Sequence, residues 1–358
     1  MSKVLKVGII GLGHLHPVSY MPHFAKCEKT KVVAASDANE ELRGGFAKQF
    51  GVNSYGDWRE LIAKEKIDLA FIFLPHCDCD QAATACAEKG IHVVVEKPVA
   101  STSEKARKIA EACTKNNVLF STPYLWRYHP VTRKMKEAID SGFLGQIVGC
   151  EGRCAAGGLH RYIEGHSEWM LDKEKSGGGP MYNLGVHWID LFRWLLGSEI
   201  SEVTGKNVHV NKAYNIEDNS FAIAAFESGP TLALDISYTV PDSYPFGRDL
   251  YLGIRGTEGC INFTPLFEGT EQSMLICSNK KEFGGAPRQT IKFELENVPG
   301  YCGQLGLEYV NEIADNIISG TKPFIGGTDA VKVLEVVETV YEAASSGHSA
   351  KVKYSSII

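Results

Sequence analysis

The sequence predicts an α/β N-terminal domain with a doubly wound parallel sheet, followed by an α+β domain with an open, largely antiparallel sheet. In the first third of the chain, short β-rich runs alternate with helical patterns, which is typical of a parallel sheet covered by helices. The later strands follow one another through hairpin-like turns, as in antiparallel sheets. A length of 358 residues suits two domains, which we expect at residues 1–122 and 123–358.

Five strands are expected in the first domain. Each is a continuous run rich in Val, Ile or Phe rather than an alternating one, as expected for strands buried on both faces. The segments between them, such as EELRGGFAKQF and TSEKARKIAEACTKN, have helical patterns. The expected strands cover residues 6–10, 31–36, 68–74, 92–96 and 118–122.

The second domain is expected to begin with a helix over residues 129–142. A loop-rich, glycine-containing stretch follows, and another helix begins at GGGP, residues 177–180. Two helices near residues 304–319 and 328–345 close the chain. Between the helix that begins at GGGP and these two closing helices, several runs alternate apolar and polar residues, which indicates half-buried strands. These strands are expected at 203–211, 219–227, 231–240, 249–264, 273–279 and 289–296.

The composition is that of an ordinary globular protein. The formal net charge is −6, so nothing favours a nucleic acid or an anionic membrane surface as a partner. No run approaches the ~20 apolar residues of a membrane span, and the apolar N-terminal stretch is too short for a signal peptide. Ten cysteines are scattered along the chain, which is not the pattern of a disulfide framework. We expect a cytoplasmic protein with reduced thiols.

A glycine loop follows the first strand directly. Gly11 would make a tight turn, and Gly13 would let the backbone approach a pyrophosphate at a helix N-terminus, as in the Rossmann fold. The third glycine position of this motif is occupied by His16. A histidine there should push the helix away or make it start later, and Pro17 is well suited to begin it.

Asp37 ends the second strand, at the position where an acidic residue would bind the adenosine ribose hydroxyls. A carboxylate there repels a 2′-phosphate, so we expect NAD as the cofactor, with NADP less favoured. Arg43, six residues further on, is the feature that would favour NADP if it turned towards the ribose. Asp37 could also cap the following helix, and both roles are compatible.

Lys97 follows the strand HVVVE in the segment Glu96-Lys97-Pro98. Because ligands bind outside the carboxyl ends of the strands in such a sheet, this lysine is expected in the cofactor crevice. Burial and a neighbouring positive charge would lower its pKa, so that it could exchange a proton with a carbinol oxygen. The alternative is a lysine at a strand end that simply reaches water.

Asn183, His187 and Asp190 are the polar residues of the apolar segment PMYNLGVHWID. Their i, i+4 and i+7 spacing predicts that they share one helix face. Such a stripe could be a catalytic face, a metal site or a set of satisfied core residues.

Taken together, these motifs resemble the glucose-fructose oxidoreductase/inositol dehydrogenase (Gfo/Idh/MocA) family. The resemblance rests on the glycine loop, the EKP segment, WRYHP, GGGPMYNLGVHWIDL, SGFLGQIVG and the C-terminal DAVKVLEVVETVYEAASSG. It implies a Rossmann domain, an open antiparallel sheet and homodimers or homotetramers formed through that sheet. It also implies hydride transfer between NAD(P) and a hydroxyl or carbonyl of a sugar, cyclitol or related polyol.

The resemblance assigns the family's catalytic lysine to Lys97 and its catalytic histidine to His187, and it implies a cis bond before Pro98. The residue four before the histidine is usually aspartate, but here it is Asn183, which we include in the catalytic set. Relatives usually have P-N-x-x-H after the strand at 68–74, and this chain has PHCDC. The expected cofactor contacts are Gly11, Leu12, Gly13, His14, Asp37, Leu74, Pro75, Glu96, Lys97 and Arg127.

The loop LHRYIEGHSEW should lie over the substrate crevice, because such loops commonly set substrate choice. Arg161 suggests an acidic or phosphorylated group on the substrate, although an arginine in a loop can also be merely solvated. Asp190 is expected to have a structural role, either holding the His187 ring or pairing with Arg193. The expected substrate contacts are Tyr124, His160, Arg161, Tyr162, Asn183 and His187.

Three alternatives to a dehydrogenase remain at this stage. A zinc site could form from His14, His16, His76, Cys77 and Cys79, but their spacing lacks a paired CxxC or HxxxH motif, so no metal is expected. The chain could instead be a redox-silent dinucleotide sensor or regulator, a possibility that Asn183 keeps open. It could also be a redox-assisted lyase or glycosidase, which would produce no net NADH.

Overall fold

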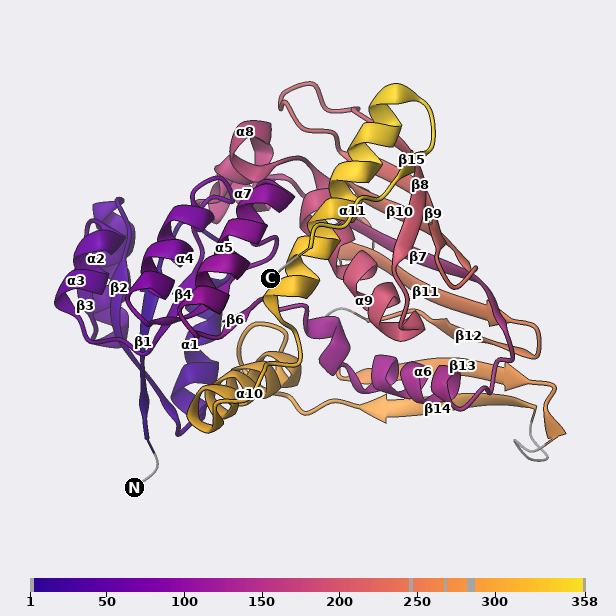
Figure 1. Cartoon of the computed structure of the whole chain (residues 1–358), viewed down its shortest axis with the longest axis horizontal. Helices are drawn as coiled ribbons and strands as arrows, with labels where there is room; N and C mark the ends of the chain where they lie inside the picture. Colours follow the sequence, from indigo (N-terminus) through magenta and orange to yellow (C-terminus); the bar gives the residue numbers. More distant parts are fainter. Residues whose placement is uncertain (1–2, 245–246, 267–268, 282–286, 357–358) are drawn as a thin grey trace.

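The computed structural model describes residues 3–244, 247–266, 269–281 and 287–356, and it contains two sheets (Figure 1). In the first, six parallel strands lie in the order β3-β2-β1-β4-β5-β6, which confirms the predicted doubly wound sheet. The strands are β1 (Leu5–Ile10), β2 (Thr30–Ser36), β3 (Asn53–Tyr55), β4 (Leu69–Ile72), β5 (His92–Val95) and β6 (Phe120–Ser121).

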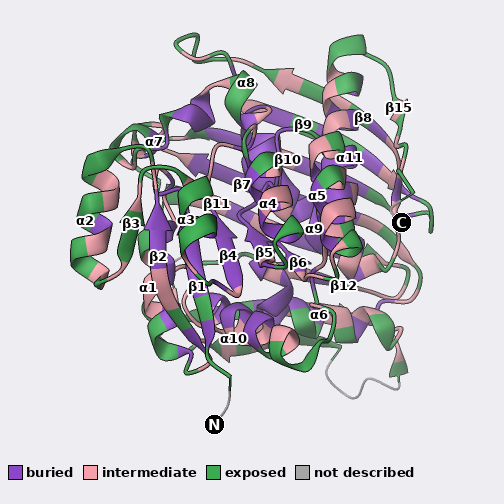
Figure 2. Ribbon diagram, turned by 60° about the vertical axis from the view of Figure 1, so that its left-hand side comes forward, coloured by how far each residue is buried: buried purple, intermediate pink, exposed green. Residues whose placement is uncertain are grey.

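The short edge strand β3 was not predicted. Its three residues, NSY, are exposed or half-buried and include no aliphatic side chain, so they lack the apolar run that marks the other strands. Pairing with β2 therefore creates this strand. Figure 2 shows β1, β4 and β5 as largely buried and much of α2 and α3 as exposed.

Five helices cover the first sheet, and α1 begins at Pro17, directly after His16. The late start matches the expectation for a histidine at the third glycine position. The N-caps of α2, α3 and α5 are Asn39, Asp57 and Thr102, whose side-chain oxygens accept backbone hydrogen bonds from the first turn. The helices are α1 (Pro17–Lys26), α2 (Glu40–Phe50), α3 (Trp58–Lys64), α4 (Cys79–Glu88) and α5 (Ser103–Lys115).

The second sheet has nine strands in the order β14-β13-β12-β11-β7-β10-β9-β8-β15. Every neighbouring pair is antiparallel except β7 and β10, which confirms an open, largely antiparallel sheet. The strands are β7 (Ile147–Gly157), β8 (Ile200–Val208), β9 (Asn219–Phe226), β10 (Thr231–Val240), β11 (Arg248–Gly256), β12 (Gly259–Phe263), β13 (Glu271–Ser278), β14 (Arg288–Glu294) and β15 (Ala350–Lys351).

The expectation of a loop-rich stretch after the helix at 129–142 was wrong for residues 147–157, because β7 lies there at the centre of the second sheet. Its glycines suggested a loop but serve packing. A Cβ at Gly152 would lie 2.2 Å from the Trp188 ring and 2.9 Å from Phe192, so the absent side chain lets helix α9 (Val186–Leu196) lie directly on the strand. The predicted strand at 249–264 is in fact the two strands β11 and β12.

Two long helices close the chain (Figure 1). Helix α11 (Gly327–Ser346) packs against both α5 and β8, and α10 (Gln304–Ser319) packs against α1. The remaining helices are α6 (Pro130–Asp140), α7 (His160–Glu164) and α8 (Lys173–Ser176). In the described part of the chain, no helix combines the length and apolarity that a membrane crossing requires.

Candidate active site

The glycine loop is held by the residue that was expected to bind ribose. Asp37 Oδ2 accepts hydrogen bonds from the backbone N–H groups of Leu12 (2.7 Å) and Gly13 (3.2 Å). Gly11 has φ +88°, and a Cβ there would lie 2.9 Å from the backbone of Phe73. Only glycine fits this turn without strain.

Asp37 also accepts from Asn39 N at 2.8 Å, but Asn39 itself caps α2. The carboxylate therefore faces the glycine loop rather than serving as the helix cap. Arg43 Nη1 donates to the Ala38 carbonyl at 3.0 Å, so its guanidinium is held on the turn between β2 and α2. Asp37 and Arg43, the two residues expected to affect the choice between NAD and NADP, thus lie at the same turn.

Lys97 is buried just after the C-terminal end of β5 and faces the second domain. Its Nζ donates to Asn183 Oδ1 at 2.7 Å and to the Asn183 carbonyl at 3.1 Å, and the Lys97–Pro98 bond is cis. Burial lowers the pKa of Lys97 to about 8; Arg248 also lowers it, and Glu96 opposes the shift. A lysine with this pKa can exist in either protonation state near neutral pH.

Asn183 is fixed by partners on both sides of its amide. Its Oδ1 accepts from Lys97, and its Nδ2 donates to the Tyr162 hydroxyl at 2.7 Å and the Tyr238 hydroxyl at 2.9 Å. Arg161 Nη2 donates to the same Tyr162 hydroxyl at 2.9 Å. The amide orientation follows from these contacts when Lys97 is charged, because an ammonium can only donate. Tyr238 was not predicted, although alternation along β10 places it on the buried face.

His187 lines a cavity of about 490 Å³ between the two sheets. Its ring lies edge-on to Tyr124, with centroids 6.1 Å apart, and its Nδ1 is buried without a hydrogen-bond partner in the described chain. Burial holds the pKa of His187 well below its usual value, and the charges of Lys97 and Arg248 lower it further. The imidazole is therefore neutral at physiological pH.

The predicted polar stripe does not act as a single face. Residues Met181–Gly185 form a π-helical turn before α9, and the three side chains have different surroundings. Asn183 contacts Lys97, His187 faces the cavity, and Asp190 is paired with Arg127.

Arg127 is engaged in a buried ion-pair network. Its Nε and Nη2 lie 2.8 and 2.5 Å from the two Asp190 oxygens, and its Nη2 lies 2.9 Å from Asp329 Oδ1. This geometry gives Arg127 a structural role at the domain junction and leaves its expected cofactor contact without support. Asp190 pairs with Arg127 rather than holding His187 or Arg193, and the main partner of Arg193 is Glu199.

The histidines that follow the strands lie around Glu96 and Trp169. His16 stacks on Tyr301 at 3.8 Å, and its Nδ1 lies 3.4 Å from Glu96 Oε2. His14 and His76 flank Trp169, with ring centroids 6.0 and 4.8 Å away. Trp169 Nε1 donates to the Gly13 carbonyl at 2.7 Å, so the loop from the second domain covers the glycine loop.

His76, which departs from the family pattern, ties the two domains together. Its Nδ1 donates to the Ser176 carbonyl at 2.7 Å, just before the GGG segment. Cys79, the second departure, donates its thiol to the Leu74 carbonyl at 3.4 Å. Within the described ranges, no group of three or more His, Cys, Asp and Glu residues is arranged to hold a metal ion.

The site fits a dinucleotide. His14 Nδ1 accepts from His16 N, so its proton lies on Nε2; His76 donates through Nδ1, so its Nε2 can only accept. Both Nε2 atoms and both Glu96 oxygens are buried without hydrogen-bond partners in the described chain. Buried hydrogen-bond donors and acceptors without partners, beside a glycine loop, match a ligand rich in hydroxyl, phosphate and amide groups.

The other residues expected to contact the cofactor or the substrate differ in how far they are buried. Leu12 and Tyr124 are buried, Leu74 and Pro75 are half-buried beside the glycine loop, and His160 is exposed. The cavity wall also includes Arg248, Tyr301 and Gln304, which sequence reasoning missed. Arg248 shares the inward face of β11 with Leu250, and strand alternation is the signal that could have placed it there.

A Rossmann sheet whose glycine loop faces a buried lysine and a cavity defines a dinucleotide-dependent oxidoreductase. Residues 5–124 match the model of the oxidoreductase family with an NAD-binding Rossmann fold (GFO/IDH/MocA), and residues 132–262 match the GFO/IDH/MocA C-terminal domain. The chain belongs to the GFO/IDH/MocA oxidoreductase family, and the predicted resemblance is confirmed. Its N-terminal domain is an NAD-binding Rossmann domain.

Several similar proteins act on sugars or cyclitols. A levoglucosan dehydrogenase from Pseudarthrobacter phenanthrenivorans is 30% identical over 72% of this chain and 73% of that protein. The NAD-dependent scyllo-inositol 2-dehydrogenase of Bacillus subtilis is 25% identical over 94% of this chain and 93% of that protein. A solved structure of levoglucosan dehydrogenase with NADH and levoglucosan has a TM-score of 0.85 at 21% identity, covering 98% of this chain and all of that one.

Proposed function

We propose that the protein is an NAD-dependent dehydrogenase that oxidises a hydroxyl of a sugar, cyclitol or related polyol, or reduces the corresponding carbonyl. The observation that carries the proposal is the buried amine of Lys97. It has a pKa of about 8, it donates to Asn183 Oδ1, and its charge acts on His187, which lines the cavity. The dehydrogenases among its relatives support the substrate class. Residues 1–122 would bind the dinucleotide, and residues 123–358 would carry the substrate site.

Lys97 is the proposed general base of the oxidation. Its neutral amine takes the proton of the reacting hydroxyl, and Asn183 Oδ1 directs it. His187 is neutral and lines the cavity, so it can donate a hydrogen bond to the reacting oxygen or accept one from it. When bound, the oxidised cofactor supplies the hydride acceptor. Reduction uses the same groups in reverse, with the ammonium of Lys97 returning the proton.

A panel of polyols and sugars with NAD tests this function against its alternatives. A dehydrogenase produces a net absorbance increase at 340 nm. A redox-assisted lyase or glycosidase would cleave its substrate without net NADH, and a sensor would bind NAD in calorimetry without turnover. Asn183 in place of aspartate keeps these alternatives open, but Lys97 retains a polar partner through the amide oxygen, which favours the dehydrogenase.

We expect a preference for NAD over NADP because the Asp37 carboxylate lies at the ribose end of the glycine loop. Asp37→Asn keeps a hydrogen-bond acceptor for Leu12 N but removes the negative charge. The ratio of kcat/KM for NAD to that for NADP should fall about tenfold or more, as expected when a charged hydrogen bond is lost. Asp57→Asn, at an exposed helix cap, is the matched control. A wild type that turns over NADP more efficiently than NAD would contradict this preference.

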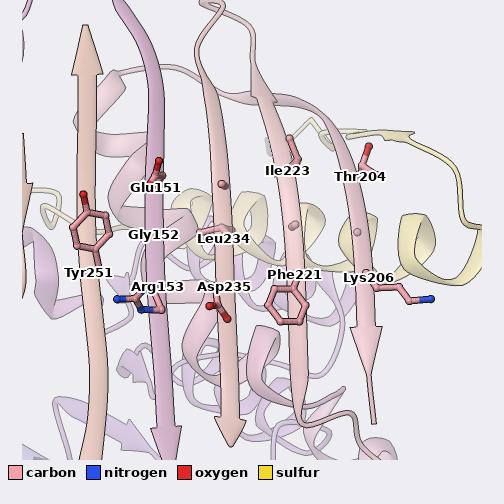
Figure 3. Close-up of a pocket in the computed structure, with 13 residues that line it drawn as sticks. Glu151, Gly152, Arg153, Thr204, Lys206, Phe221, Ile223, Leu234, Asp235 and Tyr251 are labelled. Atoms are coloured by element: carbon pink, nitrogen blue, oxygen red, sulfur yellow. The ribbon is translucent and has the colours of Figure 1, made fainter. Parts of the chain in front are cut away.

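A homodimer or homotetramer through the second sheet is also part of the proposal. The helices lie behind this sheet, and the labelled outer side chains lie in front (Figure 3). Phe221 and Ile223 on this face are 41% and 52% exposed, and they lie among Arg153, Asp235 and other charged side chains. A broad face with apolar and mixed charged residues suits a self-complementary contact.

The double variant Phe221→Lys/Ile223→Lys should yield monomers in sedimentation velocity at micromolar concentration, because like charges would face each other across the contact. Ile318→Lys, at an exposed apolar residue of α10, is the control and should leave the assembly intact. A monomeric wild type would rule out this assembly.

A cytoplasmic location is likewise proposed, and the ten free cysteines are consistent with a reducing compartment.

A further inference from the structure

We infer that Cys260 and Cys277 form an oxidative modification site, at which a low-molecular-weight disulfide converts the two thiols into a reversible disulfide bond. The site is separate from the proposed dehydrogenase chemistry and does not depend on it. Both cysteines lie in the second sheet, on the neighbouring strands β12 and β13.

The strand pairing places the two cysteines directly opposite each other. Cys260 is the antiparallel register partner of Cys277, and their Sγ atoms lie 3.0 Å apart. The Cα atoms of such partners lie about 4.5 to 5.5 Å apart, within the range of about 4.4 to 6.8 Å that a disulfide requires. A bond can therefore form through small side-chain movements while the pairing of the strands stays unchanged.

The pair lies on the outer face of the second sheet. Ile261 on β12 and Ile276 on β13 are buried on the inner face, so strand alternation directs the neighbouring cysteines to the other side. Both cysteines are half-buried, and Cys260 lines a hollow of about 240 Å³ together with Arg255. This hollow lets a small molecule approach the thiol.

An arginine flanks each thiol in the same row of the sheet. Arg255 on β11 is the register partner of Cys260, and Arg288 on β14 is the register partner of Cys277. Side chains directly opposite each other on neighbouring strands have Cβ atoms about 5 Å apart. Nearby positive charge favours the thiolate, which is the reactive form of cysteine. The row therefore combines two adjacent thiols with two groups that favour their ionisation.

The contact between the two sulfurs also affects their ionisation. Its hydrogen bond with Cys277 raises the pKa of Cys260 to about 11; burial adds to this shift, and the charge of Arg255 opposes it. One thiol of the pair therefore keeps its proton while the other ionises, and the remaining S–H can donate to the thiolate.

The other cysteines lack this arrangement. Cys77 interacts with Asp78, and Cys302 interacts with Tyr301, so neither half-buried thiol has a second thiol as its hydrogen-bond partner. The buried cysteines are Cys27, Cys79, Cys86, Cys113, Cys150 and Cys154. Oxidation by a small disulfide should therefore be selective for the pair on β12 and β13.

The reaction balances with one molecule of oxidant. One thiolate of the pair attacks a sulfur of the small disulfide, forms a mixed disulfide and releases one small thiolate. The second cysteine then loses its proton and attacks the protein sulfur of the mixed disulfide, which releases the second small thiolate. The two cysteine sulfurs are oxidised, and the two sulfurs of the small molecule are reduced and take up the two protons. Excess small thiol reverses both steps, so a reducing compartment keeps the pair reduced.

The test treats the native full chain with glutathione disulfide, blocks the free thiols with iodoacetamide under denaturing conditions and digests the protein with trypsin. Both cysteines, and no others, lie in the tryptic peptide 256–280. After oxidation this peptide should carry no alkyl group and be about 2 Da lighter than its reduced, unalkylated form, because a disulfide lacks two hydrogens. Gels without reductant should show a single chain, and dithiothreitol should restore both alkylation sites.

Cys260→Ser and Cys277→Ser each leave one thiol of the pair. Each variant should accumulate the mixed disulfide with glutathione that the second thiol resolves in the wild type. Cys77→Ser, at a half-buried cysteine of the first domain, is the matched control and should form the disulfide like wild type. Thermal unfolding shows whether each variant is folded, and the peptide analysis of the wild type needs no variant.

A peptide 256–280 that stays fully alkylated, or that carries glutathione on both cysteines, would overturn the inference. A disulfide that joins two chains or uses another cysteine would overturn it as well. The readout is the mass of the peptide rather than NADH formation. Failure of the proposed dehydrogenase function would therefore leave this result unchanged, and failure of the disulfide would not affect the proposed function.

Discussion

Lys97→Ala should lower kcat for polyol oxidation by about 10²- to 10⁴-fold, the range associated with loss of a general acid–base group. The amine is buried, has a pKa of about 8 and is directed by Asn183 Oδ1, and we propose no other residue for the same proton. The measurement is steady-state NADH formation with the best substrate of the panel. The Kd of NAD, measured by calorimetry, should change much less than kcat.

Lys97→Arg separates the charge from the proton transfer. An arginine keeps the positive charge but cannot lose its proton in this pH range, so it should be nearly as inactive as alanine. Lys89→Ala, at the end of α4, is the control on an exposed lysine. Turnover at the wild-type rate in Lys97→Ala would remove the lysine from the mechanism.

Asn183→Asp should move the pH profile of oxidation to higher pH by about one pH unit or more. Oxidation requires the neutral amine, so wild-type kcat/KM should rise as pH passes through the Lys97 pKa of about 8. A carboxylate in place of the amide oxygen, which lies 2.7 Å from Nζ, would stabilise the ammonium and raise that pKa. If the pKa of Lys97 rose from about 8 to about 9, the neutral fraction at pH 7 would fall about tenfold.

Tyr238→Phe is the informative companion variant for Asn183→Asp. It removes one acceptor of Asn183 Nδ2 without adding a charge, so the activity can fall but the pH at which kcat/KM rises should stay near that of the wild type. If kcat/KM rose at the same pH in Asn183→Asp as in the wild type, residue 183 would position the substrate rather than set the pKa of Lys97. A large gain of activity at every pH would mean that the natural chemistry has moved away from the family's usual reaction.

Local patterns predicted the first domain well because its determinants are local. Strands buried on both faces must be continuous apolar runs, and β1, β2, β4 and β5 all have them. The glycine loop and the EKP segment were found for the same reason, since a tight turn and a strand end leave signatures in neighbouring residues. The edge strand β3 has no such signature and forms only by pairing.

The second domain shows where local patterns fail. The segment of β7 was expected to lie in a loop-rich stretch because of glycines such as Gly157. Within the strand, the missing side chain of Gly152 is explained only by Trp188 lying on it. Helical spacing suggested that Asn183, His187 and Asp190 share one face, but the π-helical turn and the partners of each residue separate them. Neither the packing of α9 on β7 nor the turn can be read from short-range periodicity.

By itself, the sequence determined the fold class, the glycine loop with Asp37, and the position of Lys97 after a buried strand, because each depends on residues close together in the chain. The catalytic roles of Lys97 and His187 stay predictions. Tertiary structure alone decided which charges meet. It pairs Arg127 with Asp190 across 63 positions, joins Lys97 to Asn183 across 86, and places Arg248 in the wall of the cavity that His187 lines. Electrostatic interactions depend on distance in space and on burial, and only the folded chain sets these two quantities.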